Sequence, residues 1–321
     1  MMMRFMMTTT LGAAAILAAL PALASEDIAD QYPGSALYSK PVEVIPNVFS
    51  AIGATAPPGE ANAGHNNNLS FVITGDGVVV VNAGANNALA AALHDEIRAV
   101  TDQPVRLVIN ENGQGHAMLG NGYWVDQGVP VLAHVDAAEE FEAHGYEILS
   151  GMQNYAGPYA GDSRAQGPTE VFEDRYDVPF GDVAIEVLHL GPAHSAGDIS
   201  VWLPEQGLVI AGDMAFHERM LPLFADTDTS DWIDTWDNAF EPLGATYVIP
   251  GHGHPTNMDQ VRRFTRDYLV YLRDKIGAHI EAGGTLTDAY YVDQSPYARL
   301  DTFEELATKN AGRVFEEMEW E

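Results

Sequence analysis

The chain has 321 residues and is strongly acidic, with 46 Asp plus Glu against 15 Lys plus Arg and a formal net charge of −31. Its length suits one large α/β domain or two modest ones, and its 46% of hydrophobic residues can form a substantial core. The acidic charge repels phosphate backbones, so nucleic acid is not an expected partner. Cysteine is absent, which excludes disulfides, thiolate metal sites and cysteine nucleophiles.

The first residues have the pattern of an export signal. Arg4 precedes an apolar run over residues 11–20, and Ala22-Leu23-Ala24 offers a small-residue cleavage site. We therefore expect residues 1–24 to be a signal peptide, so that the mature protein is periplasmic or secreted. No later run is long and apolar enough to cross a bilayer, so we expect no membrane association after cleavage.

The first half of the chain predicts an arm followed by strands and helices. Residues 25–41 lack periodicity and indicate an N-terminal arm, and residues 42–53 indicate two short strands about a turn. Residues 68–84 predict a hairpin whose second strand, Val78 to Val81, is apolar throughout and hence buried on both faces. Further elements are expected as a helix over 85–100, a strand over 104–110, a helix from about Ala117, a strand over 129–134 and a helix over 135–149.

The second half begins with a long loop and ends in helices. Residues 151–169 are rich in Gly, Pro and Tyr without a period, which predicts a loop that faces substrate or is mobile. Strands are expected over 170–174, 176–181, 183–191, 198–213 and 245–253. The pattern from Met258 to the end is mostly helical. We therefore expect one domain over 42–257, made of two mixed sheets covered by helices, with a helical extension over 258–321 packed on it.

Polar side chains gather in four loops that follow strong strands. The loops are "NENGQGHAMLGN", "LGPAHSAGD", "AGDMAFHE" and "VIPGHGHP", and they carry His116, His194, Asp213 and His252. Strand ends of this kind converge at one edge of a sheet. Imidazole and carboxylate are suitable ligands for zinc, iron or manganese where thiolate is absent.

In this order the loops resemble the metallo-β-lactamase superfamily, over about Val44 to His254. "GDGVVVVNAG" is similar to the opening hairpin of that family, "GPAHSAGDISVWLPEQGLVIAGDMAF" to its middle block and "VIPGHG" to its last one. The resemblance implies a four-layer αββα sandwich of two mixed β-sheets with helices on the outer faces. It also implies a metal site along one edge of the two sheets.

The first ligand loop departs from the family pattern. The family's His-x-His-x-Asp-His positions fall on Asn112, Gln114, His116 and Ala117, and the hairpin's usual aspartate is Asn82. Two full metal sites are therefore not expected. The resemblance implies one divalent ion, zinc before iron or manganese, or no metal at all. The ligands that it implies for a single ion are His116, His194, Asp213 and His252.

The function implied is that of an exported metallo-hydrolase acting on an ester, lactone, amide or thioester of a small molecule with metal-activated water. Asp213 would be a ligand or orient the nucleophile, and His116 would be either a ligand or the general base. Asn112 and Gln114 would contact substrate or steer water, and Asn82, His134 and His217 would support the site. The alternative is a periplasmic binding protein for a small ligand, without catalysis, on a scaffold that has lost its metal.

Overall fold

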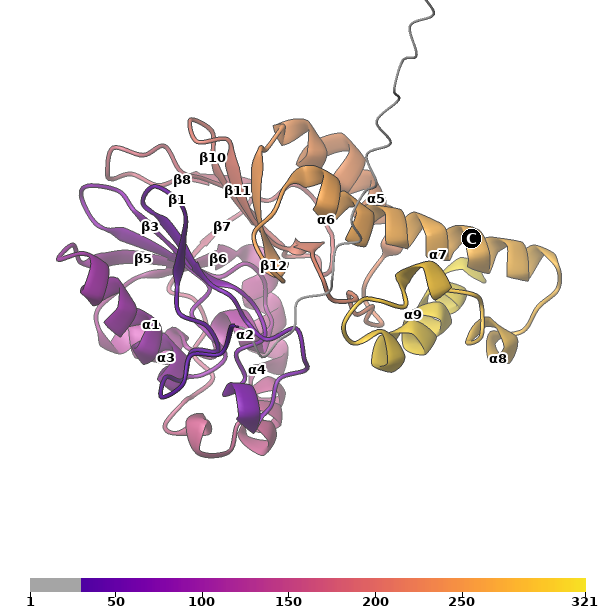
Figure 1. The fold of residues 1–321 in the computed structure, drawn as a ribbon, viewed down its shortest axis with the longest axis horizontal. Coiled ribbons are helices and arrows are strands. Elements are labelled where there is room, and N and C mark those ends of the chain that lie inside the picture. Colours follow the sequence, from indigo (N-terminus) through magenta and orange to yellow (C-terminus); the bar gives the residue numbers. More distant parts are fainter. Residues whose placement is uncertain (1–29) are drawn as a thin grey trace, which may run out of the picture.

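The structure, a computed structural model, describes residues 30–321. The expected signal peptide and residues 25–29 of the arm lie outside the described residues. Two sheets form the centre of the molecule, one with the strand order β1-β2-β3-β4-β5-β6-β7 and one with the order β12-β11-β10-β9-β8 (Figure 1). The fold is the α/β sandwich of two mixed sheets that the sequence predicts.

The strands of the first sheet are β1 (Val42–Ile45), β2 (Val48–Ala51), β3 (Leu69–Ile73), β4 (Val78–Val81), β5 (Val105–Ile109), β6 (Val131–His134) and β7 (Glu170–Phe172). Those of the second sheet are β8 (Arg175–Asp177), β9 (Glu186–Leu188), β10 (Ser200–Leu203), β11 (Leu208–Phe216) and β12 (Tyr247–His252). The α-helices are α1 (Asn87–Val100), α2 (Gly115–Met118), α3 (Asn121–Asp126), α4 (Val135–Tyr155), α5 (Thr229–Thr235), α6 (Met258–Phe264), α7 (Arg266–Glu281), α8 (Leu286–Ala289) and α9 (Phe303–Met318).

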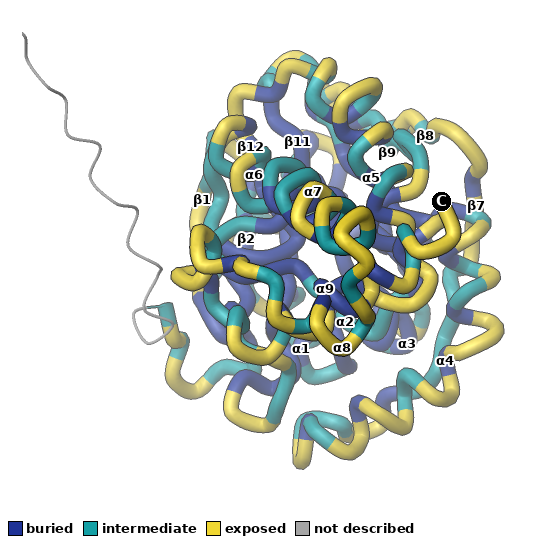
Figure 2. Tube along the Cα trace, turned by 90° about the vertical axis from the view of Figure 1, so that its right-hand side faces the viewer, coloured by how far each residue is buried: buried dark blue, intermediate teal, exposed yellow. Residues whose placement is uncertain are grey.

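Strand β4 illustrates how the sequence builds the layers. Its side chains alternate between the two faces of the sheet, as in any strand. Val79 and Val81 pack between the sheets, against a cluster that includes Val201 and Ile210 of the second sheet. Val78 and Val80 pack on the opposite face, in the cluster that holds α1 and α3. The continuous valine run is therefore buried on both faces, and the interior strands are the most buried part of the chain (Figure 2).

The C-terminal helices cover the outer face of the second sheet. Val209 and Phe216 of β11 belong to the same core cluster as Leu272 of α7 and Val314 of α9. Figure 1 shows these helices beside the second sheet and remote from α1. Since buried apolar area is the main stabilising contribution, the helices after β12 share one core with the sheet that positions the candidate site.

Two local features differ from the sequence-based expectation. The segment 151–169 was expected to be loop throughout, but α4 continues to Tyr155 and a 3-10 turn follows over Gly157–Ala160. The helix continues because Met152 is fully buried, in a cluster against which Tyr155 also packs. The helix expected from Ala117 is two short helices, α2 and α3. Within residues 30–321, no helix combines the length and the apolar character needed to span a bilayer.

Candidate metal centre

Three elements bring the predicted ligands together. His116 lies on α2, in the loop that follows β5, and His252 is the last residue of β12. Asp213 lies within β11, which pairs in parallel with β12 through an irregular register near Gly212. Gly212 has φ +62°, a left-handed conformation that favours glycine, and Asp213 follows it directly.

The carboxylate of Asp213 is the centre of the cluster. Its Oδ1 lies 3.2 Å from Nε2 of His252, and its Oδ2 lies 3.5 Å from Nε2 of His116. In the described part of the chain, these three residues are the one group of three or more potential ligands whose donor atoms all lie within 4.8 Å of one another. All three are buried or nearly so.

His252 is held by the segment that precedes β3. Its Nδ1 lies 2.5 Å from the carbonyl oxygen of Asn66, which can accept a hydrogen bond from it. The Asn68 amide in turn donates to the carbonyls of Pro250 and Gly253 at 2.8 and 2.7 Å, and so fixes the end of β12. A carbonyl acceptor at Nδ1 leaves Nε2 as the free lone pair facing Asp213, which is the usual arrangement of a ligating histidine.

His194 is fully buried beside the cluster but is not a member of it. Its Nδ1 lies 3.7 Å from Asp213 Oδ2 and 2.9 Å from the side-chain nitrogen of Gln114. Its Nε2 is buried without a hydrogen-bond partner. Of the four ligands that the resemblance implies, His116, Asp213 and His252 therefore converge. His194 lies next to the Asp213 carboxylate but outside this group.

Two buried carboxylates complete the site, and sequence reasoning missed both. Glu111 is 1% exposed, and its Oε1 lies 3.0 Å from His116 Nε2. Asp198 is equally buried and accepts hydrogen bonds from the backbone N–H of Ser195 at 2.5 Å and from the Asn112 amide at 3.2 Å. The same amide lies 3.3 Å from Asp213 Oδ2, so Asn112 bridges two carboxylates and prevents their direct contact.

Burial and neighbouring charges shift the pKa values of the three buried carboxylates in different directions. Burial would raise the pKa of Asp213, but the imidazoles of His116 and His252 outweigh it and hold the pKa below its usual range. Burial raises the pKa of Asp198 well above its ordinary value, and the neighbouring Asp213 adds to the effect. Burial also raises the pKa of Glu111, with Asp213 again adding to it.

One of the three imidazoles at the site has a raised pKa, and the other two have lowered pKa values. Burial would lower the pKa of His116, but the carboxylates of Asp213 and Glu111 outweigh it and raise the pKa. Burial lowers the pKa of His194, and it lowers the pKa of His252 to about 4. His194 and His252 are therefore neutral near pH 7, the form in which imidazole binds a metal.

Two observations indicate that the cluster can hold a divalent ion. One donor atom from each of the three residues lies within 4.8 Å of the others, and donors bound tetrahedrally to zinc at about 2.0–2.1 Å lie roughly 3.3 Å apart, so small side-chain shifts would bring them onto one ion. Asp213 Oδ1 and His194 Nε2 are moreover buried without a hydrogen bond, and such atoms require a partner. Both donor types suit zinc, and carboxylate with imidazole also suits iron and manganese.

The residues predicted to support the site differ in how closely they do so. Asn82, at φ +70°, accepts a hydrogen bond from the Glu111 backbone N–H at 3.1 Å and so positions that residue. His217 contacts the carbonyl of His254 at 2.9 Å and braces the loop after β12. His134 does not contact the cluster.

His134 instead begins α4, where its Nδ1 accepts a hydrogen bond from the Asp136 N–H at 3.2 Å. Its ring stacks on His189 at a centroid distance of 3.8 Å, and His189 lies 3.0 Å from the Ala196 carbonyl oxygen. His134 thus reaches the loop that carries His194 only through His189. Its own role is to cap α4, because its ring accepts a hydrogen bond from the first turn of that helix.

The cluster opens into a cavity of about 460 Å³. Gln114 and Arg219 border it near the metal centre, and apolar side chains from α4, from the segment 222–224 and from α9 form its walls. The residues that make these walls apolar are Pro57, Pro58, Ile148, Met152, Pro222, Phe224 and Leu306. The cavity is of the size of small-molecule sites, in which an apolar lining surrounds a few convergent polar groups.

Comparison with known proteins agrees with the architecture. The sequence model of the Metallo-beta-lactamase superfamily matches residues 115–252. A metallo-beta-lactamase type 2 from Bacteroides fragilis is 29% identical over 116 residues, which cover 34% of this chain and 47% of the relative. The corresponding enzyme from Bacillus cereus is 22% identical over 184 residues, 56% of this chain and 64% of the relative. The chain thus spans about half to two thirds of the curated relatives it matches.

Solved structures show the same fold at low identity. DIM-1 metallo-beta-lactamase superposes with a TM-score of 0.57 at 16% identity, covering 72% of this chain and 96% of its own. The sec-alkylsulfatase Pisa1 from Pseudomonas sp. superposes with a TM-score of 0.64 at 17% identity, covering 87% of this chain and 50% of its own. The chain therefore has the metallo-beta-lactamase fold, with low sequence identity to each of these relatives.

Proposed function

We propose that the protein is an exported, single-metal hydrolase that cleaves an ester, lactone, amide or thioester bond of a small molecule. The observation that carries this proposal is the convergence of His116, Asp213 and His252 at the base of a largely apolar cavity. Three protein donors with space in front of them are typical of a catalytic metal site, whereas structural sites are closed by four.

His116, Asp213 and His252 would hold the ion, and His194 would complete the set or contact the group being attacked. A divalent ion supplies a Lewis acid for the carbonyl oxygen and a nucleophile from water near neutral pH. Asn66 keeps Nε2 of His252 directed at the centre. Asn112, with its amide between Asp198 and Asp213, keeps the latter carboxylate in place.

His116 has a second role when it is not a ligand. In this role Nε2 would donate to the carboxylate of Glu111, Nδ1 would accept a proton from water, and the carboxylates of Glu111 and Asp213 would stabilise the imidazolium that forms. A carboxylate behind a proton-accepting imidazole is the arrangement that orients such a base in hydrolases. The two roles exclude each other at any one moment.

The apolar cavity and the net charge narrow the substrate class. Ile148, Met152, Phe224 and Leu306 favour a molecule with an apolar part. A net charge of −31 disfavours polyanions. This supports a small, largely apolar substrate rather than a nucleic acid, and export follows the signal-like pattern of residues 1–24.

The test is turnover of a panel of chromogenic esters and lactones by the zinc-loaded protein. We expect His116→Ala to abolish turnover, and His144→Ala, an exposed imidazole on α4, to leave it unchanged. Turnover that persists in His116→Ala would remove this residue from the mechanism. Absence of any zinc-dependent turnover across the panel would contradict the hydrolase.

A second candidate is a ligand-binding protein without a metal. It is favoured by the hydrogen bond that joins Gln114 to Nδ1 of His194, and by the contact of Glu111 with Nε2 of His116. These contacts engage two imidazole nitrogens with protein partners. Small-ligand binding by protein that carries no metal, together with stability that zinc does not change, would support this candidate over the hydrolase.

A further inference from the structure

Helix α9 forms one wall of the cavity that contains the metal centre. Thr302 at its N-cap and Glu305, Leu306 and Lys309 in its first two turns border the cavity.

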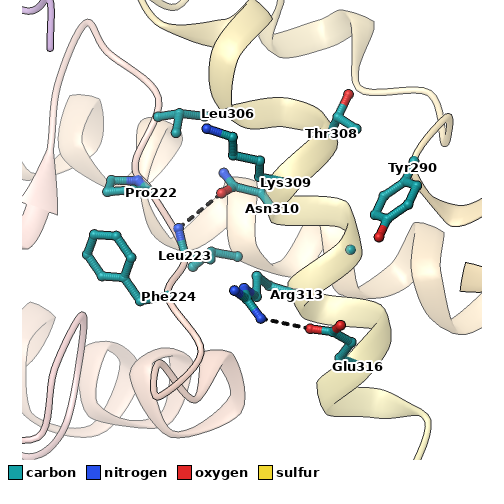
Figure 3. A pocket seen from close by; sticks show the side chains of 11 residues that line it. Pro222, Leu223, Phe224, Tyr290, Leu306, Thr308, Lys309, Asn310, Arg313 and Glu316 are labelled. Atoms are coloured by element: carbon teal, nitrogen blue, oxygen red, sulfur yellow. Dashed lines mark hydrogen bonds and ion pairs between the residues drawn. The ribbon is translucent and has the colours of Figure 1, made fainter.

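A second hollow of about 480 Å³ lies between the segment 222–224 and α9 (Figure 3). Four residues border both the hollow and the cavity, namely Pro222, Phe224, Leu306 and Lys309. The hollow and the cavity therefore adjoin at these side chains.

Buried hydrogen bonds fix this wall. Asn310 is fully buried, and its Oδ1 accepts from the Leu223 backbone N–H at 3.0 Å. Its amide donates to the Leu221 carbonyl at 2.8 Å and to the Tyr268 hydroxyl at 3.0 Å. Because one buried amide joins α9 to the segment before Phe224 with two hydrogen bonds and to α7 with a third, the boundary between the two hollows is well defined.

Phe224 presents an apolar surface at that boundary. Its side chain is 45% exposed, and its ring lies 5.1 Å from the ring of His194 in an edge-to-face arrangement. With Leu306 on the opposite side, it forms an apolar contact surface next to the metal centre. An exposed apolar surface in this position is suited to the body of a ligand.

Lys309 supplies a positive charge in the same place. Most arginines in the described chain form ion pairs with carboxylates, but Lys309 forms none within residues 30–321. Its side chain leaves α9 on the side of the segment 222–224, as does that of Arg313 one turn later (Figure 3). Arg313 is paired with Glu316 at 2.9 Å, and Glu305 lies one turn before Lys309 at the cavity border.

The hollow along α9 and the adjoining wall of the cavity, with Phe224, Leu306 and Lys309, are called the annex. We propose that this annex selects amphiphilic substrates with an anionic oxygen headgroup, a carboxylate or a sulfate monoester, bound by Lys309 with Arg313 nearby. The apolar body then lies against Phe224 and Leu306, and the bond to be cleaved faces His116, Asp213 and His252. As a substrate preference the proposal rests on the proposed hydrolase, but the binding of such anions does not need turnover. A single ammonium group in a chain of this net charge attracts a monoanion without favouring polyanions.

Equilibrium binding tests the proposal independently of catalysis. Octanoate, octyl sulfate and the uncharged octanamide are titrated by calorimetry into the full-length mature protein at low salt. We expect at least one of the two anions to bind about tenfold tighter than octanamide, as a charge-assisted contact predicts. The two anionic arms distinguish a carboxylate site from a sulfate site, and the preference should weaken at high salt.

Three variants assign the effect to the annex. Lys309→Gln should abolish the preference for anions, and Glu305→Gln should increase it by a few-fold because a repelling charge is removed. Lys275→Gln, a lysine that lies over Tyr271 on α7, is the matched control and should leave the preference unchanged. Equal binding of octanamide and both anions, or a preference that survives in Lys309→Gln, would overturn the proposal. Either result is independent of whether the protein hydrolyses esters, which the chromogenic panel decides.

Discussion

Acidification is expected to destabilise the protein through His65, a fully buried imidazole in the segment that holds His252. Nδ1 of His65 accepts a hydrogen bond from the Tyr38 backbone N–H at 2.8 Å. The next residue, Asn66, provides the carbonyl that contacts His252. Burial lowers the pKa of His65 to about 3, so the folded protein keeps this ring neutral in moderate acid.

The magnitude follows from the linkage between protonation and folding. In the unfolded chain the pKa of histidine is about 6.5, so the unfolded state gains a proton below that pH whereas the folded state does not. The stabilisation is therefore fully present above pH 6.5 and is lost as the pH falls toward 3. Between pH 7.5 and pH 5.0, His65 alone should reduce the free energy of unfolding by roughly 2 kcal/mol.

Urea denaturation at these two pH values measures the effect, with EDTA present to exclude metal. The matched variant is His65→Asn, whose Oδ1 can accept the Tyr38 hydrogen bond but does not titrate. The difference in unfolding free energy between pH 7.5 and pH 5.0 should be about 2 kcal/mol smaller in the variant than in the wild type. Equal losses in both proteins would refute the reasoning.

Three further predictions concern the metal centre. Zinc at one hundred times its Kd should stabilise the wild type by about 2.7 kcal/mol, and Asp213→Asn should remove most of this gain, as thermal unfolding with and without zinc will measure. Gly251→Ala should lower the urea midpoint and weaken zinc binding, because a Cβ at this position would collide with Asp213 Oδ1 and with the backbone of Gly212. Glu111→Gln should reduce the stability of the metal-free protein by about 1–3 kcal/mol in urea, since the buried His116 loses a charged partner.

The sequence predicts the architecture well because two physical signals agree. The valine run of β4 marks a strand buried on both faces, and the structure places its side chains in the two cores on either side of the sheet. The glycine-rich loops after strong strands mark the edge at which His116, Asp213 and His252 meet. Hydrophobic periodicity and turn-forming residues are local features, so both can be recognised within a single segment of the sequence.

The details of the site depend on contacts that no local pattern contains. Glu111 follows β5, but its backbone N–H donates to the side chain of Asn82, 29 residues earlier, and its carboxylate lies against His116. Asp198 lies four residues after His194, and that spacing was the available signal for it. Lys309 borders the cavity only because α9 returns across the sheet, an arrangement fixed by Asn310 and by the packing of the C-terminal helices.

The central claim is that His116, Asp213 and His252 hold a single divalent ion. Metal analysis of the purified protein by mass spectrometry, after incubation with zinc and removal of excess, tests this claim most directly. We predict about one ion per chain in the wild type and almost none in a variant with Asp213→Ala and His252→Ala combined. Two ions per chain, or equal and negligible metal in both proteins, would contradict the account.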